Sequence, residues 1–346
     1  MKRRRTLNQR LDDAIERFTP TIAEAFRSAI QGVKDTVLIT DLVGALEAGD
    51  PIRALRVLGF NDAAMRPLTA AIEQAFENGG ITAASAFPRL TDGLGTRAVF
   101  RFDVRNSRAE AWLRDRSSRL VSRINEQTLE NIRNTLNDGM RLGTNPRETA
   151  LNIVGRLDPA TGQRAGGIIG LTPMQERWIS SARAELADPE TASNWFTRKR
   201  RDKRFDSIVR KSIEDNVPLD TVTINKLTTR YSDSMLKLRG DTIARTESIA
   251  ALNQSAQESL QQAVDNGSID KSAVKRIWDS AGDDGRTRES HLIMDGQAVG
   301  LNEPFTAPDG SRMMYPGDTS LGASAEETIN CRCRVRLSVD WLAGAG

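Results

Sequence analysis

The residues from Ile329 to Val339 read INCRCRVRLSV, and apolar or thiol side chains alternate in them with polar ones. A period of two is typical of a half-buried β-strand. On such a strand Cys331 and Cys333 share the inward face, so the pattern predicts that both sulfur atoms lie in the interior. We expect no disulfide between them, because side chains two apart on an extended strand are badly placed for an unstrained bridge.

Signals around this strand predict a small module of helix and short antiparallel strands over residues 241–346. Residues 274–278 (VKRIW) have the composition of a strand, and residues 286–294 fit one short helix. Ala307-Pro308-Asp309-Gly310 is a strong turn signal between two short strands. The final strand is expected over residues 328–339, where it completes a small sheet.

Residues 1–240 are expected to form a helical body. Helix starts are indicated at Asp50-Pro51, Asn145-Pro146 and Thr172-Pro173-Met174-Gln175, where a capping residue precedes a proline. Further helices are expected from 66–67 to 78–80, over 103–140, from 188–189, up to Gly240 and over 241–266. Residues 158–170 are expected to form an exposed glycine-rich loop, whose apolar tip either inserts into a partner or, as we favour, packs as a turn on its own domain. The predicted class is therefore α+β, with a helical body at 1–240, open to a further division near 143–172, and a module at 241–346.

Composition excludes several classes of protein. The chain has 346 residues, 38% of them hydrophobic and 27% charged, with a mean hydropathy of −0.45. No apolar run approaches the roughly 20 residues of a membrane span, and the basic start is followed by no apolar stretch, so neither membrane insertion nor export is expected. Two cysteines make no disulfide framework, which favours a reducing compartment.

The net charge is only +3, but basic residues are concentrated in places. One group is Arg198, Lys199, Arg200, Arg201, Lys203 and Arg204, and a second is Arg332, Arg334 and Arg336 on the outer face of the final strand. Such groups are able to neutralise phosphates or contact an acidic partner, with binding that weakens steeply as salt rises. The alternative is that each group is a solvated surface.

His291 is the only histidine of the chain. If residues 286–294 are helical, Asp295 lies near the same face, four residues further on. With Cys331 and Cys333 these residues make a zinc set of two thiolates, one imidazole and one carboxylate. The spacing leaves open a second interpretation, in which the thiols are buried core groups and the histidine is hydrogen-bonded in a turn.

A different use of the histidine would be catalytic. Asp279, Asp283 and Asp284 with His291 resemble the ligands of a divalent ion in small DNA-cleaving enzymes. Such an enzyme needs a second base, and the chain has no second histidine. Metal-dependent DNA processing is therefore the alternative function, beside DNA binding without catalysis.

The order of many residues in the last third resembles one family. The pattern comprises Ile243-Ala244-Arg245-Thr246-Glu247, Asn253, Trp278, Asp283 and Asp284, Arg286-Thr287-Arg288, His291, Asp295-Gly296, Glu303-Pro304-Phe305, Asp309-Gly310, Tyr315-Pro316-Gly317-Asp318 and Ile329-Asn330-Cys331-Arg332-Cys333. Over residues 240–336 it is similar to the phage Mu F-like head morphogenesis proteins, which are minor head proteins of tailed bacteriophages.

The resemblance implies a virion structural protein without catalytic activity. It implies a location inside the capsid near the portal vertex, after assembly in the host cytoplasm, and contact with the portal protein. The major capsid or scaffolding protein and the packaged double-stranded DNA are further expected partners. His291, Asp295, Cys331 and Cys333 would be signature residues of the module. Zinc binding by them is an inference from their residue types and not from the resemblance.

Overall fold

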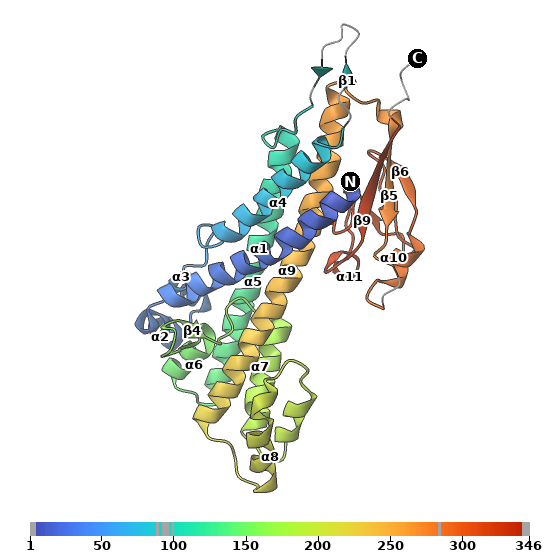
Figure 1. Ribbon diagram of the computed structural model, residues 1–346. Coiled ribbons are helices and arrows are strands. Elements are labelled where there is room, and N and C mark those ends of the chain that lie inside the picture. Colours follow the sequence, from blue (N-terminus) through green and yellow to red (C-terminus); the bar gives the residue numbers. More distant parts are fainter. Residues whose placement is uncertain (1–4, 88–89, 92–96, 99, 283–284, 341–346) are drawn as a thin grey trace. The chain divides into compact units, whose positions relative to one another are not determined.

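The computed structural model describes residues 5–87, 90–91, 97–98, 100–282 and 285–340 (Figure 1). The helices are α1 (Leu7–Thr36), α2 (Ile39–Glu47), α3 (Pro51–Val57), α4 (Arg66–Ala84), α5 (Ser107–Arg141), α6 (Pro146–Val154), α7 (Pro173–Leu186), α8 (Asp206–Glu214), α9 (Thr221–Asp265), α10 (Glu289–Ile293) and α11 (Ala325–Thr328). The strands are β1 (Leu90–Thr91), β2 (Arg97–Ala98), β3 (Arg156–Leu157), β4 (Arg164–Ala165), β5 (Val274–Asp279), β6 (Ala298–Gly300), β7 (Phe305–Thr306), β8 (Arg312–Met313) and β9 (Arg334–Val339). Helices dominate the first part and short antiparallel strands the last, which confirms the predicted α+β class.

Residue contacts divide the chain into two compact units. The first comprises Met1–Glu24, Leu68–Ser117 and Asp241–Gly346, and the second comprises Ala25–Pro67 and Ser118–Gly240. Helices α1, α5 and α9 each contribute residues to both units. This division differs from the sequence-based one at residue 240, because two segments from the first third of the chain pack with the C-terminal residues.

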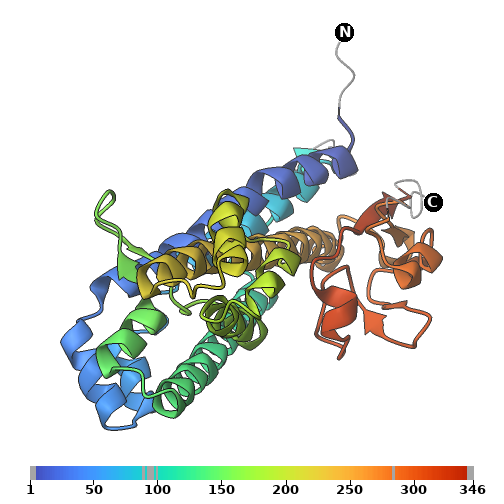
Figure 2. The ribbon, with the colours of Figure 1, turned by 90° about the horizontal axis from the view of Figure 1, so that it is seen from below.

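The C-terminal part of the first unit is built on a three-stranded antiparallel sheet of order β6-β5-β9. In the β5–β9 register Trp278 lies opposite Val335, and Val274 lies opposite Val339. Strands β7 and β8 form the short hairpin that the turn signal at 307–310 predicts. Figures 1 and 2 show the elements that follow α9, in orange to red, gathered into one group.

The final strand is shorter than predicted. It begins at Arg334 instead of residue 328, because α11 occupies the residues up to Thr328 and Asn330 takes a left-handed conformation with φ of 57°. Cys331 and Cys333 therefore precede the strand. Both are nevertheless buried, at 1% exposure each, and both are free thiols, so the alternation correctly predicts their burial but not their secondary structure.

The core of this group surrounds Trp278. Its indole ring meets the Phe305 ring edge-on at 5.3 Å between centroids. Met313, Tyr315 and both cysteines belong to the same buried cluster. Aromatic pairs of this kind add stability beyond the area that they bury, so the cluster fixes the hairpin against the sheet.

Arg276 in β5 is a fully buried cation. Its guanidinium donates to the carbonyl oxygens of Gly300, Met314 and Glu303 and to the side-chain oxygen of Gln257 in α9. Burial lowers its pKa to about 10. A buried charge is tolerated only when its donors are satisfied, and here the acceptors tie the sheet to α9 and to the loops after β6 and β8.

Helix α4 does not stop at Asn78-Gly79-Gly80 as predicted; it continues to Ala84. A Cβ on Gly79 would lie 2.2 Å from Ser255 Oγ, and one on Gly80 would lie 2.3 Å from the Phe102 ring. The glycines are therefore needed for close contact with α9 and with Phe102, and they do not signal a helix end.

Helix α9 is continuous over 45 residues, so the predicted break at Gly240 is wrong. A glycine inside a helix costs about 1 kcal/mol relative to alanine, which packing along so long a helix offsets. The predicted stop at Asn266-Gly267 is confirmed, with Gly267 at φ of 76°. Across the residues that the structure describes, no helix has the length and apolar character needed to cross a membrane.

In the second unit the predicted helix starts are confirmed. Asp50 accepts a hydrogen bond from Arg53 N at the start of α3, and Asn145 accepts one from Arg147 N at the start of α6. Thr172 makes the predicted reciprocal capping box at the start of α7. In each case a side-chain oxygen satisfies a backbone N–H that has no partner within the helix.

The glycine-rich segment after α6 is not the exposed loop that the sequence predicts. Strands β3 and β4 form a hairpin, and the chain then turns inward so that Ile168 and Ile169 are buried at 3% and 0% exposure. Lys34 Nζ, also buried, donates to Gly166 O at 2.7 Å, while Gly166 N donates to Asp233 Oδ1 at 2.8 Å. The apolar residues are thus part of the unit's own core.

The helix expected to start at Asp188-Pro189 is also absent from the described residues. Two 3₁₀ turns, Ala192–Thr197 and Lys203–Phe205, lead to α8 instead. Trp195, fully buried, fixes the first turn and meets the Tyr231 ring edge-on. One large side chain that must reach the core overrides the local helical preference.

Candidate functional site

His291, Cys331 and Cys333 form a buried cluster in the first unit. The Sγ atoms of both cysteines lie 3.4 Å from His291 Nδ1. His291 is 0% exposed and each cysteine is 1% exposed. Of the described histidine, cysteine and acidic residues, these are the ones whose ligand atoms gather within 4.8 Å of one another, as a metal site requires.

Glu327 from α11 faces the other nitrogen of the imidazole. Its Oε2 lies 2.8 Å from His291 Nε2 but off the N–H direction. Ser290 Oγ donates to both oxygens of this carboxylate, at 3.2 and 3.1 Å. The Trp278 ring packs edge-on against the His291 imidazole, with 5.1 Å between the ring centroids. The imidazole therefore has a carboxylate near Nε2 and two sulfur atoms near Nδ1.

The pKa values of the two thiols are shifted in opposite directions. The hydrogen bond between them lowers the pKa of Cys333, and the nearby His291 lowers it further against the effect of burial. The same hydrogen bond, with burial, raises the pKa of Cys331. Cys333 N also donates to Cys331 Sγ at 3.4 Å. Cys333 therefore loses its proton at a lower pH than Cys331 does.

Helix α9 holds the cysteine segment in place. Asn330 N donates to Thr246 Oγ1 at 2.9 Å, and Val335 N donates to Asn253 Oδ1 at 3.2 Å. These two bonds bracket the cysteines and satisfy backbone groups that the strand ladder does not reach. The left-handed Asn330 directs the chain from α11 toward the site.

A buried ion pair holds the turn at residues 315–318 in the same unit. Arg116 Nε in α5 lies 2.7 Å from Glu247 Oε2, and Arg116 Nη1 donates to Gly317 O at 3.2 Å. Trp112 Nε1 donates to Tyr315 Oη at 2.9 Å. Glu247 and the Tyr315-Pro316-Gly317-Asp318 turn thus have structural partners, and both are buried.

Of the four predicted metal ligands, the structure brings together His291, Cys331 and Cys333. It does not bring Asp295 to them: the Asp295 carboxylate accepts a hydrogen bond from Ser280 N at 2.8 Å. The reason is that α10 ends at Ile293, so the four-residue spacing does not continue as helix. Glu327 has the carboxylate position instead, and the sequence signal for it was only the helix cap Ser324 three residues earlier.

The alternative catalytic set is not assembled among the described residues. Asp279 pairs with Arg334 at 3.2 Å and with Arg336 at 3.6 Å, and it does not join the His291 cluster. Asp283 and Asp284 lie outside the described residues. His291 is fully buried.

The first basic group separates into paired and exposed side chains. Arg198 pairs with Glu185 at 2.6 Å and Arg201 pairs with Asp206 through two bonds of 2.9 Å. Their side chains are only 11% and 13% exposed. The exposed members are Lys199, Arg200, Lys203 and Arg204, of which Arg204 pairs with Asp202. Two of the predicted contact residues therefore stabilise the fold locally.

The second basic group is largely engaged as well. Arg334 pairs with Asp12 of α1 and with Asp279, and Arg336 lies near the same Asp279 carboxylate. Arg332 is half-buried beside Arg245, whose pKa is lowered by burial and then by that arginine. The expected outward stripe of three cations is thus partly neutralised within its own unit.

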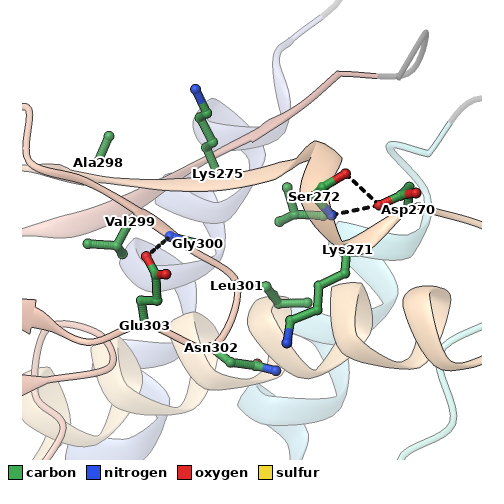
Figure 3. A pocket seen from close by; sticks show the side chains of 11 residues that line it. Asp270, Lys271, Ser272, Lys275, Ala298, Val299, Gly300, Leu301, Asn302 and Glu303 are labelled. Atoms are coloured by element: carbon green, nitrogen blue, oxygen red, sulfur yellow. Dashed lines mark hydrogen bonds between the residues drawn. The ribbon is translucent and has the colours of Figure 1, made fainter. Parts of the chain in front are cut away.

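A separate open hollow of about 760 Å³ lies along the outer edge of the sheet (Figure 3). It is lined by Asp270, Lys271, Ser272, Val274, Lys275, Ala298, Val299, Gly300, Leu301, Asn302 and Glu303. The Asp270 carboxylate accepts from Ser272, and the Glu303 carboxylate accepts from Gly300 N at 2.9 Å. Both acids therefore serve local turns, and the hollow carries no cluster of reactive groups.

Comparison with known proteins finds matches for part of the chain. Residues 209–336 match the family described as Phage Mu protein F like protein. The uncharacterized protein YqbB of Bacillus subtilis (strain 168) is 28% identical over 137 residues, which cover 39% of this chain and 41% of that protein. The chain thus matches less than half the length of that relative. No solved structure matches.

Proposed function

We propose that this chain, which over residues 209–336 is a phage Mu F-like protein, is a minor head protein that binds the portal vertex inside the capsid of a tailed bacteriophage. Its part in the virion would be to assist head morphogenesis, DNA packaging or DNA delivery. The family match carries this proposal, since the family is one of phage head morphogenesis. The portal protein is the proposed main partner, with the major capsid or scaffolding protein as further candidates.

The roles of the signature residues support a non-catalytic function. Glu247 holds a buried arginine, Asn253 holds the chain at β9, and His291 lies under the protein surface with both thiols. A catalytic group must reach its substrate, whereas these groups fix the fold. Partner contacts would then come from exposed residues of the helices.

Copurification tests the portal proposal. The full chain is expressed with the portal protein of the same phage, and the portal is captured through a tag. We expect the chain to be retained through size exclusion in a fixed ratio to the portal. A chain that elutes alone at micromolar concentrations of both proteins would contradict the proposal.

Exposed basic residues lie between the first 3₁₀ turn and the start of the second. They favour a second activity, contact with packaged double-stranded DNA. Lys199, Arg200 and Lys203 are exposed and lie close together in sequence. Exposed cations exchange bound counterions for phosphates, so affinity depends on salt with a slope of about 0.9 per phosphate contacted. Arg198 and Arg201 are less available for this role, because they pair with Glu185 and Asp206 and are only 11% and 13% exposed.

Charge reversal separates this activity from general electrostatics. We expect Lys199→Glu with Arg200→Glu to lower the salt slope of duplex DNA binding by about 2. The matched control reverses Arg53 and Arg56, which are exposed in α3, and should change the slope little. Equal effects of the two double variants would show that only net charge matters and would refute a local DNA contact.

A further inference from the structure

We infer that His291 Nδ1, Cys331 Sγ and Cys333 Sγ bind one zinc ion, and that Glu327 orients the imidazole from behind. This site is independent of the portal and DNA proposals. It replaces the ligand set expected from sequence, because Asp295 is engaged with Ser280. The ion would have a structural role, joining α10 to the segment that leads into β9.

The spacing of the three atoms fits a tetrahedral ion. Zinc–sulfur bonds of about 2.3 Å and zinc–nitrogen bonds of about 2.0–2.1 Å place a sulfur and a nitrogen about 3.5 Å apart at the tetrahedral angle. Both sulfur-to-Nδ1 distances are 3.4 Å. The two sulfur-to-nitrogen separations therefore match an ion bound by all three atoms, and the two sulfur atoms lie within 4.8 Å of each other.

Hydrogen bonding alone explains this geometry less well. A ring nitrogen makes one good hydrogen bond, as donor or as acceptor, yet both sulfur atoms approach the same Nδ1 at 3.4 Å. The other nitrogen faces the Glu327 carboxylate at 2.8 Å. With the proton at Nε2, Nδ1 is the acceptor, and a single metal bond uses its lone pair while the two sulfurs occupy neighbouring corners.

Glu327 has the position of the carboxylate found behind many zinc-bound histidines. It does not touch the ion's place; it acts through the far nitrogen of the ring. Ser290, next to His291 in α10, in turn holds the carboxylate through both oxygens. Such a carboxylate sets the ring orientation and strengthens the metal–nitrogen bond, and its loss typically costs 10–100-fold in metal affinity.

The ligand types select zinc over the commoner cellular cations. Two thiolates and an imidazole are poor ligands for Mg²⁺ or Ca²⁺, which prefer oxygen. The described residues supply three ligands, so a four-coordinate ion takes its fourth from outside this set, with water the simplest choice. The Trp278 ring packs against the imidazole and limits access to it.

Elemental mass spectrometry on the full chain tests the inference. Protein purified without chelator should carry about one zinc per chain, and a competing chelator should give its affinity. We expect Glu327→Gln to bind zinc 10–100-fold more weakly with unchanged far-UV circular dichroism. The matched control is Asp295→Asn, which should keep the wild-type affinity because Asp295 lies outside the cluster.

Cobalt substitution reads the ligands without removing a cysteine. Co²⁺ added to the chelator-treated wild-type chain should give an intense thiolate-to-cobalt charge-transfer band. Adding zinc should abolish the band, since zinc binds such sites more tightly. This measurement remains decisive if Cys331→Ser with Cys333→Ser fails to fold.

Three outcomes would overturn the inference. They are a folded chain that carries no zinc and takes up none, a cobalt spectrum without the thiolate band, and Asp295→Asn losing zinc while Glu327→Gln keeps it. The first would leave the thiols as core groups, and the last would restore the sequence-based ligand set.

Discussion

The buried pair of Arg116 and Glu247 allows a quantitative test of how the first unit is held together. Both side chains are nearly buried, at 8% and 7% exposure, and two N–H groups of the guanidinium contact the two carboxylate oxygens. The third contact of the guanidinium is Gly317 O. The perturbation is Glu247→Gln, which keeps the volume and removes the counter-charge.

The expected loss of stability comes from the Arg116 charge, which stays buried without its partner. Removing one partner of a buried pair leaves an uncompensated charge and costs about 3–5 kcal/mol. Since a tenfold change in equilibrium is about 1.4 kcal/mol, local opening should become about 10²- to 4 × 10³-fold more populated. Replacing both residues by methionine should cost much less, with about 1 kcal/mol left for the donor lost by Gly317 O.

Amide hydrogen exchange, read by mass spectrometry on peptides of α5, α9 and the 315–318 turn, measures these openings locally. Arg114→Met is the matched control, because Arg114 is an exposed arginine of the same helix and should change exchange by less than about 0.5 kcal/mol. A Glu247→Gln cost below about 1 kcal/mol, or a double variant as unstable as the sum of the single ones, would refute the reasoning.

Two further predictions concern stability. Burial lowers the pKa of Lys34 to about 8, whereas its pKa in the unfolded chain is about 10.4. Between these two pH values the unfolded chain binds more protons than the folded chain does. The second unit should therefore gain stability as the pH rises from 8 to 10, by at most about 3 kcal/mol. Melting curves over this range should show the rise in the wild type and not in Lys34→Met, and a rise in both would contradict it. Gly79→Ala should destabilise the first unit, because its Cβ would lie 2.2 Å from Ser255 Oγ. The control Gly44→Ala in α2 places a Cβ with no atom within 4 Å and should stabilise the protein by about 0.5–1 kcal/mol. If Gly79→Ala causes no loss of stability, the close helix contact is not needed.

Local signals predicted helix starts well and helix ends less well. Asp50, Asn145 and Thr172 cap the helices whose starts they predict. Such caps can be predicted from sequence because each is a hydrogen bond between residues close together in the chain. Gly79 and Gly240 were interpreted as ends, yet α4 and α9 continue through them. What a glycine does depends on the element packed against it, and the local sequence does not contain that information.

The candidate site shows the same limit. Burial of Cys331 and Cys333 followed from alternation, and their meeting with His291 followed from the few residue types able to bind zinc. The sequence predicts Asp295 as a further ligand, because four residues of helix would place it beside the histidine. The short α10 removes that relation, and α11, inserted before the cysteines, brings Glu327 in from 36 positions further along the chain.

The residues that resemble the phage Mu F-like pattern lie on several elements between residues 243 and 333, and several of them make contacts between distant segments. Thr246 and Asn253 on α9 accept hydrogen bonds from backbone on either side of the cysteines, and Glu247 between them binds the arginine that holds Gly317. One helix thus fixes two loops through three side chains. Substitution of any of the three should disturb the loops before it affects a partner, so we expect partner specificity to lie in exposed residues outside the signature, where the fold places fewer demands on residue type.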